Sequence, residues 1–251
     1  MKKNDRIWEL DALRGVCILC VIAVHLIYDL GFFIGLDLHL PAWYVFIQQY
    51  GGVIFVILSG CCATLGSRSF RRGCIVFSCG MLISLVTFGM YRLGMASRDV
   101  IVWFGVLHLN AAAVLLTCLV YPLLQRLPAG AGLAASAALF ALTNQLPEGY
   151  LGFENWRLCA VPAGLYKTNW FWLGLPDLTQ FASADYFPIL PWVFLFWCGV
   201  FLAEFRKPKR GEAPVVLRPL CAVGRNTLLV YMLHQPVIYG VLWVGHAVMG
   251  R

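Results

Sequence analysis

Residues Asp11–Asp29, DALRGVCILCVIAVHLIYD, indicate the fold class of this protein. Most of its residues are Val, Ile, Leu, Cys and Ala, the composition of a helix in contact with lipid. It begins with an acid and an arginine, and it carries His25 and Asp29 further along. Ionisable side chains inside membrane helices are costly and normally face a bundle interior or a wet cavity, so these residues require an explanation.

The composition of the whole chain is that of an integral membrane protein. Of its 251 residues, 61% are hydrophobic and 12% are charged, with a mean hydropathy of +0.77. Soluble domains are usually about 45–50% apolar and about 25% charged. The net charge of +7 does not indicate a nucleic-acid partner, because the basic residues lie between apolar runs. The ten cysteines lack zinc-ligand spacing, so we expect no metal site and assign them to packing.

Seven apolar runs are candidates to span a bilayer, which takes about 20 mostly apolar residues. They are residues 12–35, 42–65, 74–95, 100–124, 129–146, 187–205 and 221–249. Acidic residues precede the first run, which we therefore interpret as a retained helix rather than a cleaved signal peptide. The sequence thus predicts an all-α, polytopic transmembrane helix bundle of about seven helices, with residues 1–251 forming a single domain.

The charge distribution predicts the orientation of this bundle. With the N-terminus in the cytoplasm, 14 of the 19 lysines and arginines lie on the inner side and 5 on the outer side. Residues 147–186 then form a long outer loop before the sixth helix, rich in Trp, Tyr and Phe. This loop fits an interfacial segment with aromatic anchors, and it equally fits a lid or acceptor site, because aromatic surfaces stack on sugar rings.

Three of the five histidines are predicted to reach a similar depth in the membrane. His25 lies eleven residues after Arg14, which is about 16 Å along a helix. The fourth helix enters the membrane from the outer side and carries His108. His234 lies nine residues past Arg225 on the last helix. Each histidine alone also fits a structural hydrogen bond between helices. Together they predict a polar cavity near the membrane centre with arginines at its cytoplasmic mouth.

The residue types in this cavity have recognisable chemical uses. An imidazole is the usual general base for a hydroxyl or amine, and His25 is the first candidate. Asp29 lies one helical turn beyond His25 and would fix its tautomer if it reaches the ring. Arg14 and Arg225 are fixed cations where an anionic cytosolic ligand would arrive, although both also fit snorkelling anchors.

Four segments carry a family resemblance. They are LDALRGVCILCVIAVH, FGVLHLNA, ADYFPILPWVFLFWCGVFLAE and VGRNTLLVYMLHQPVIYG. The first resembles the opening helix of the membrane acyltransferase superfamily, whose members share an Arg and a His separated by ten residues, here Arg14 and His25. In this order the four segments resemble the heparan-alpha-glucosaminide N-acetyltransferase catalytic-domain family, which includes short bacterial members.

The resemblance implies an acyltransferase of the bacterial inner membrane that uses cytosolic acyl-CoA, most of all acetyl-CoA, as co-substrate. The acceptor would be an amine or hydroxyl of a sugar or glycan on the outer side, with a membrane-embedded histidine as base. Residues and resemblance together nominate His25, Asp29, His108 and His234 for catalysis, Arg14, Arg225 and Asn226 for acyl-CoA, and Asn110, Asp185, Tyr186, Tyr231 and Gln235 for substrate binding. His108, Asn110 or Asn226 could donate to the developing oxyanion. In the animal heparan enzymes an Asn stands at the position of His25, so the choice of histidine stays open.

Two other function classes fit the same cavity. One is a proton-coupled transporter or flippase of a small solute, although no internal repeat supports it. The other is a non-catalytic membrane subunit. The sequence leaves open the acceptor, N- against O-acylation, the acyl chain length, direct transfer against an acyl-histidine intermediate, and homodimer formation. Asp185 and Tyr186 equally fit a cap on the sixth helix.

Overall fold

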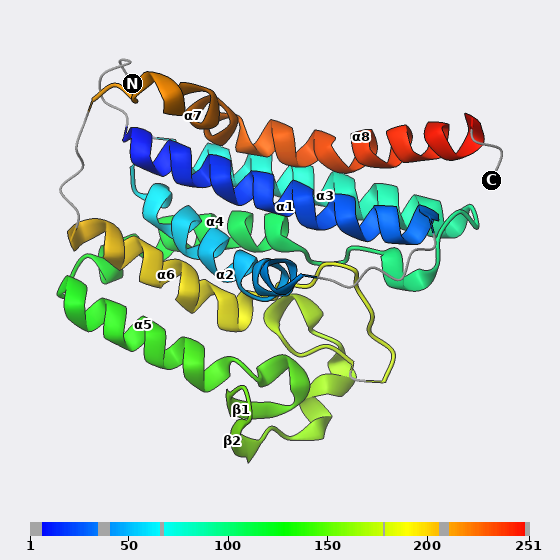
Figure 1. Ribbon diagram of the computed structural model, residues 1–251. Helices are drawn as coiled ribbons and strands as arrows, with labels where there is room; N and C mark the ends of the chain where they lie inside the picture. The colour runs from blue at the N-terminus through cyan, green and yellow to red at the C-terminus, as the bar shows by residue number, and fades with distance from the viewer. Residues whose placement is uncertain (1–6, 35–40, 66–67, 178, 206–210, 249–251) are drawn as a thin grey trace. The chain divides into compact units, whose positions relative to one another are not determined.

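The computed structural model of the protein describes residues 7–34, 41–65, 68–177, 179–205 and 211–248. Its α-helices are α1 (Trp8–Ile34), α2 (Ala42–Ala63), α3 (Ser69–Arg92), α4 (Val106–Leu124), α5 (Ala129–Thr143), α6 (Ile189–Phe205), α7 (Arg218–Arg225) and α8 (Thr227–Val248) (Figure 1). This architecture confirms the predicted all-α polytopic fold. Several cations used for the predicted orientation lie outside the described residues, namely Lys2, Lys3, Arg6, Arg206, Lys207, Lys209, Arg210 and Arg251.

Five helices are long and apolar enough to cross a bilayer: α1, α2, α3, α4 and α8. Helices α5 and α6 are shorter, with 15 and 17 residues. Large apolar side chains on the candidate spans are exposed in the isolated chain, among them Leu82, Leu85 and Val86 of α3. Such extensive apolar surface requires an apolar environment. The protein is therefore an integral membrane protein.

The internal contacts divide the chain into two compact units. One comprises residues 1–55 with 207–251, and the other comprises residues 56–206. Helix α2 contributes residues to both units. The description of residues 1–251 as a single domain therefore stays a prediction.

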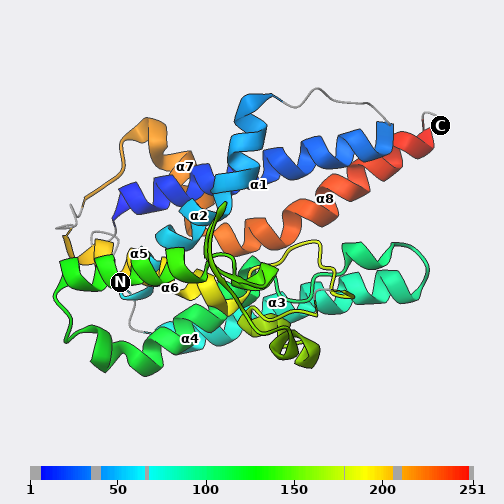
Figure 2. The same ribbon diagram turned by 90° about the horizontal axis from the view of Figure 1, so that it is seen from below.

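In the first unit, α1 packs against α7 and α8 (Figures 1 and 2). Glycines permit a close crossing of α1 and α7. A Cβ atom on Gly224 would collide with the carbonyl oxygen of Asp11, and one on Gly15 would collide with that of Leu220. Small residues at such crossings let helix backbones approach closely. The crossing therefore fixes α7 against the cytoplasmic end predicted for α1.

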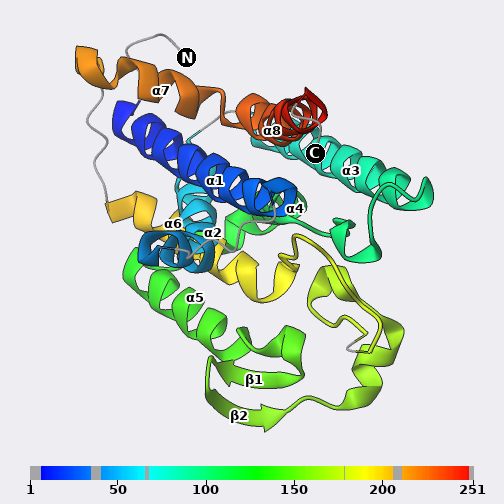
Figure 3. The ribbon, with the colours of Figure 1, turned by 45° about the vertical axis from the view of Figure 1, so that its right-hand side comes forward.

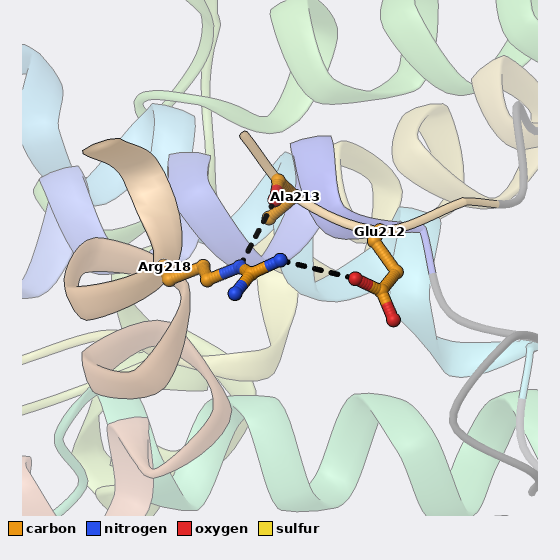
Figure 4. Close-up of polar contacts among 3 residues, drawn as sticks. All are labelled: Glu212, Ala213 and Arg218. Atoms are coloured by element: carbon orange, nitrogen blue, oxygen red, sulfur yellow. Dashed lines mark hydrogen bonds and ion pairs between the residues drawn. The ribbon is translucent and has the colours of Figure 1, made fainter. Parts of the chain in front are cut away.

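The last apolar run, residues 221–249, does not form one helix. Helix α7 ends at Arg225, and the backbone N–H of Asn226 bonds to the carbonyls of Ala222 and Val223 before α8 begins. At the start of α7, the Arg218 guanidinium donates to a Glu212 carboxylate oxygen at 3.0 Å and to the Ala213 carbonyl at 3.4 Å (Figure 4). These contacts join α7 to the segment before it.

In the second unit, α3 packs on α4, α5 packs on α6, and α4 also contacts α6. The core includes Phe196, Phe201 and Leu109, whose side chains are fully buried. A Cβ atom on Gly199 would collide with the carbonyl oxygen of Ile57, so the end of α2 and α6 are in backbone contact there. The second unit is therefore a closely packed group of helices.

The long loop before α6 contains regular structure that the sequence did not predict. Strand β1 (Tyr150–Phe153) pairs antiparallel with β2 (Trp156–Ala160), beside the end of α5 (Figure 3). Strands of four and five residues give too short an alternation to be distinguished from a loop. The loop then returns along the segment before α4, where the Ala184 N–H bonds to the Ile101 carbonyl at 3.0 Å.

Candidate active site

A pair of histidines occupies the interface of α1 and α8. The ring centroids of His25 and His234 lie 5.1 Å apart, with the ring planes inclined at 58°. His234 is 8% exposed, and His25 is half-buried. Sequence depth alone placed both residues near mid-membrane, and the structure brings them into direct contact.

The hydrogen bonds of His234 define its tautomer. Its Nδ1 lies 2.5 Å from the carbonyl oxygen of Tyr231, one turn earlier on α8. A carbonyl oxygen only accepts, so Nδ1 carries the proton. In the neutral ring Nε2 is then an unprotonated acceptor, and this buried atom has no hydrogen-bond partner among the described residues. Buried polar atoms are usually satisfied, so an unpaired one in a cluster of ionisable groups points to chemistry or to a ligand.

Asp29 bonds to Gln235 rather than to His25. The Gln235 amide nitrogen donates to an Asp29 carboxylate oxygen at 2.9 Å, and Asp29 is 7% exposed. The amide oxygen of Gln235 is buried and lacks a hydrogen-bond partner in the part of the chain that the structure describes. The cluster therefore offers two free acceptors, Nε2 of His234 and Oε1 of Gln235, on adjacent residues of α8.

The two candidate arginines come from the glycine crossing of α1 and α7. Arg14 precedes Gly15, and Arg225 follows Gly224. A Cβ atom on Gly224 would lie 2.8 Å from the backbone nitrogen of Gly15, so the backbones at these positions are adjacent. Asn226, the third predicted donor-site residue, follows directly and uses its side-chain nitrogen on the Ala222 carbonyl at 2.9 Å. The structure thus groups Asn226 with the two arginines that the sequence had placed at one mouth.

His108 has a different environment, in the second unit. Its Nδ1 accepts from the backbone N–H of Gly105 at 3.2 Å, so Nε2 carries the proton and faces the Ser84 hydroxyl at 3.3 Å. Ser84 in turn donates to the Val102 carbonyl at 2.6 Å. Both ring nitrogens are therefore satisfied by groups that hold the start of α4. Ser84 gave no local sequence signal, because it lies 24 residues from its partner.

Asp185 and Tyr186 also make structural contacts. An Asp185 carboxylate oxygen accepts from the backbone N–H of Val106 at 2.9 Å, which caps α4 rather than the sixth helix. Burial raises the pKa of this carboxyl to about 6, although the bond from Val106 opposes the rise. The Tyr186 hydroxyl donates to the Phe171 carbonyl at 2.7 Å. Asn110 donates to the Val106 carbonyl at 2.8 Å, which leaves its buried oxygen without a hydrogen bond to any described residue.

Comparison with known proteins places the chain in a family. Residues 6–236 match the family described as heparan-alpha-glucosaminide N-acetyltransferase, catalytic. The chain belongs to this family. The residues matched by the heparan-alpha-glucosaminide N-acetyltransferase family include the His25–His234 pair, His108 and the two arginines Arg14 and Arg225. No curated protein and no solved structure matches the chain.

Family membership makes the protein a membrane transferase of the acetyltransferase type. Among the residues that the structure describes, no group of three His, Cys, Asp or Glu side chains could hold a metal ion. The candidate site of this heparan-alpha-glucosaminide N-acetyltransferase family member contains imidazole, carboxylate, amide and guanidinium groups.

Proposed function

We propose that the protein transfers an acyl group, in the first place acetyl, from cytosolic acyl-CoA to an amine or hydroxyl of a sugar-type acceptor on the outer side. Membership of the acetyltransferase family supports the reaction class. The observation that carries the proposal is the buried Nε2 of His234, which has no partner among the described residues and lies beside a second imidazole. Nε2 is the atom that a general base would use.

In the proposed step, the acceptor nitrogen or oxygen forms a bond to the thioester carbonyl carbon, and Nε2 of His234 takes the acceptor's proton. The tetrahedral intermediate then breaks its carbon–sulfur bond, and the imidazolium returns the proton to the departing thiolate. The Tyr231 carbonyl orients the ring for this task, because it fixes the proton on Nδ1. General base catalysis of this kind contributes about 10²–10⁴-fold to the rate.

His234 thus takes the role of base for which His25 was the first candidate in the sequence. The Tyr231 carbonyl fixes the tautomer of His234, whereas Asp29 bonds to Gln235 and leaves His25 without the orienting carboxylate that was expected. We propose that the His25 side chain contacts the bound substrates, because its ring lies beside that of His234. His108 is assigned to positioning α4, because its ring nitrogens are engaged by Gly105 and Ser84.

Arg14, Arg225 and Asn226 are proposed to bind the anionic part of acyl-CoA. Two guanidinium groups from adjacent backbones suit phosphates, which arginine recognises through paired N–H donors. Acetyl-CoA should therefore raise the melting temperature of the purified protein, because a ligand that binds only the folded state stabilises it. Arg14→Ala and Arg225→Ala should weaken this effect. Arg218→Ala is the matched control, since its guanidinium is engaged by Glu212 and Ala213.

The deciding experiment measures acetyl transfer by purified protein. Acetyl-CoA is incubated with a panel of amino sugars and glycosides, and mass spectrometry follows its loss together with the acetylated product. His234→Ala should lower kcat by roughly 10²-fold or more. Leu229→Ala, an exposed position on the same helix, serves as the control and should retain turnover. Normal turnover by folded His234→Ala protein would contradict the proposed base.

A further inference from the structure

A cavity of about 210 Å³ lies in the second unit, outside the groups used in the proposed chemistry. It is lined by residues of two segments, the one before α4 and the final part of the long loop. Its lining includes Arg98, Trp103, Asn169, Phe171, Asp177 and Gln180. At about 30 Å³ for each water molecule, the volume equals roughly seven waters, which suits one small ring-shaped ligand.

One part of the lining is aromatic. Phe171 and the neighbouring Phe181 are stacked, with centroids 5.4 Å apart and planes inclined at 20°. Trp103 meets Phe171 at 6.4 Å and 55°, so these two rings are not stacked face to face. The Trp103 backbone is anchored by a bond from its N–H to the Ser183 hydroxyl at 3.1 Å. The rings form a fixed apolar surface on which the C–H face of a sugar can pack.

The other part of the lining is polar and holds both donors and acceptors. Asn169 accepts from the Asp177 backbone N–H at 2.9 Å, and its amide nitrogen has no hydrogen bond to any described residue. Asp177 accepts through one carboxylate oxygen from the Thr179 hydroxyl and backbone N–H, at 2.6 and 2.9 Å. These bonds lower the pKa of Asp177, so its carboxylate is ionised at neutral pH. A carboxylate accepts about four hydrogen bonds, so Asp177 retains capacity for a ligand.

We propose that this cavity binds a single saccharide ring. A ring with one apolar face and a rim of hydroxyls matches an aromatic wall faced by a carboxylate, amides and the Arg98 guanidinium. The lining carries one basic and one acidic side chain, Arg98 and Asp177, so it favours neither an anion nor a cation. An acyl chain would leave the polar groups unpaired. That the ring belongs to the acceptor rests on the proposed function, whereas its binding does not.

The test measures binding of free sugars to the full-length protein, without any acyl donor. The protein is held in a detergent whose head group is not a sugar, because glucoside and maltoside detergents would occupy the cavity. Saturation-transfer NMR is recorded with methyl β-glucopyranoside and with glucosamine. Sorbitol is the matched ligand control, because it carries the hydroxyls but lacks a ring with an apolar face.

Variants then locate the binding. We expect saturable transfer to the ring protons of the pyranosides and an affinity about ten-fold weaker in Asp177→Asn and in Gln180→Ala, the change expected for loss of a good hydrogen bond. Lys167→Ala alters an exposed residue of the same loop outside the lining, and it should bind like the parent protein. Equal signals from sorbitol, unchanged affinity in both variants, or no saturable signal would overturn the proposal. Preferential binding of glycerol phosphate would do so as well, by indicating a lipid headgroup.

The outcome separates this inference from the proposed acyl transfer. Sugar binding without any reaction of acetyl-CoA would support the saccharide site and contradict the proposed acyltransferase activity. Acetyl transfer to a sugar by protein variants that lack this binding would support the proposed acyltransferase activity and show that the acceptor binds outside this cavity.

Discussion

His234 and His108 are both buried histidines, yet their hydrogen bonds leave different atoms free. In His234 the Nδ1–H group donates a hydrogen bond to the Tyr231 carbonyl, and Nε2 is unpaired among the described residues. In His108 one nitrogen accepts from Gly105 and the other faces Ser84. A base needs a free lone pair, whereas a ring with two engaged nitrogens stabilises the groups around it.

His108→Ala should therefore act on stability. The change leaves the Gly105 N–H without its acceptor and opens a cavity, so we expect the free energy of unfolding to fall by about 2–4 kcal/mol. Denaturant or thermal unfolding measures this loss. Ser78→Ala removes an exposed hydroxyl of α3 and should change stability by less than about 0.5 kcal/mol. A His108→Ala protein of normal stability that lacks turnover would return His108 to the chemistry.

Asp185 makes stability depend on pH. Burial raises the pKa of its carboxyl from 3.8 to about 6 in the folded protein. Between these values the folded protein retains a proton that the unfolded chain has lost, so the free energy of unfolding falls as pH rises. The contribution is complete below about pH 4 and is lost as pH passes through about 6. The difference corresponds to roughly 3 kcal/mol.

Asp185→Asn should remove this dependence while its side-chain oxygen still accepts from Val106. We expect equal melting temperatures near pH 4 and a higher melting temperature for the variant at pH 7. Since all other titrating groups are common to both proteins, the difference between the two melting curves isolates Asp185. Parallel pH profiles would show that the carboxyl titrates in its ordinary range.

Among the helices, the contact of α1 with α7 positions the proposed donor site. Gly15 and Gly224 permit backbone contact there, and each is the sequence neighbour of a candidate arginine. The geometry of the proposed phosphate site therefore depends on residues that touch no ligand. Helix α7 has only eight residues, so its position depends on this packing rather than on its own helical stability.

Gly224→Ala should weaken both stability and donor binding, because the added methyl group collides with the Asp11 carbonyl rather than with a flexible side chain. We expect a loss of about 1–3 kcal/mol and a smaller thermal shift with acetyl-CoA. Gly240→Ala is the matched helical control, since its Cβ would meet no described atom within 4 Å apart from the nearby backbone of its own helix. It should be neutral or slightly stabilising, by about 0.5–1 kcal/mol. Equal behaviour of the two variants would show that α7 can shift without consequence.

For the whole molecule, the orientation in the membrane decides which substrate reaches which group. The excess of arginine and lysine on one side predicts a cytoplasmic N-terminus and an outer loop over residues 147–186. The proposed donor site at Arg14 and Arg225 would then face the cytoplasm. The hairpin and the cavity lining from Asn169 to Gln180 would face outward.

Labelling of cysteines tests this orientation. Cys159 is exposed on β2, and Val216 is 87% exposed just before α7. In intact cells that express the protein, a membrane-impermeant maleimide should modify Cys159 and should reach Val216→Cys only after lysis. Peptide mass spectrometry identifies the labelled residue among the ten native cysteines. Labelling of Val216→Cys alone in intact cells would indicate the inverse orientation.

The membrane class, most helix positions and the family resemblance could be predicted from the amino-acid sequence. Long hydrophobic runs indicate helices that span the membrane, and the rise per residue of a helix gives the depth of each residue in the membrane. For this reason Arg14, His25 and His234 could be nominated before any contact was known. The tertiary structure then showed that His25 and His234 are neighbours.

The partners of the polar groups could not be predicted and became known from the folded chain. Asp29 meets Gln235 across 206 positions, and Asp185 caps a helix that begins 79 positions earlier. Depth along a helix does not specify which face meets which neighbour, so the sequence could not distinguish the free nitrogen of His234 from the engaged nitrogens of His108. The cavity near Asp177 was equally hidden, because its lining comes together only when the long loop folds back on the segment before α4.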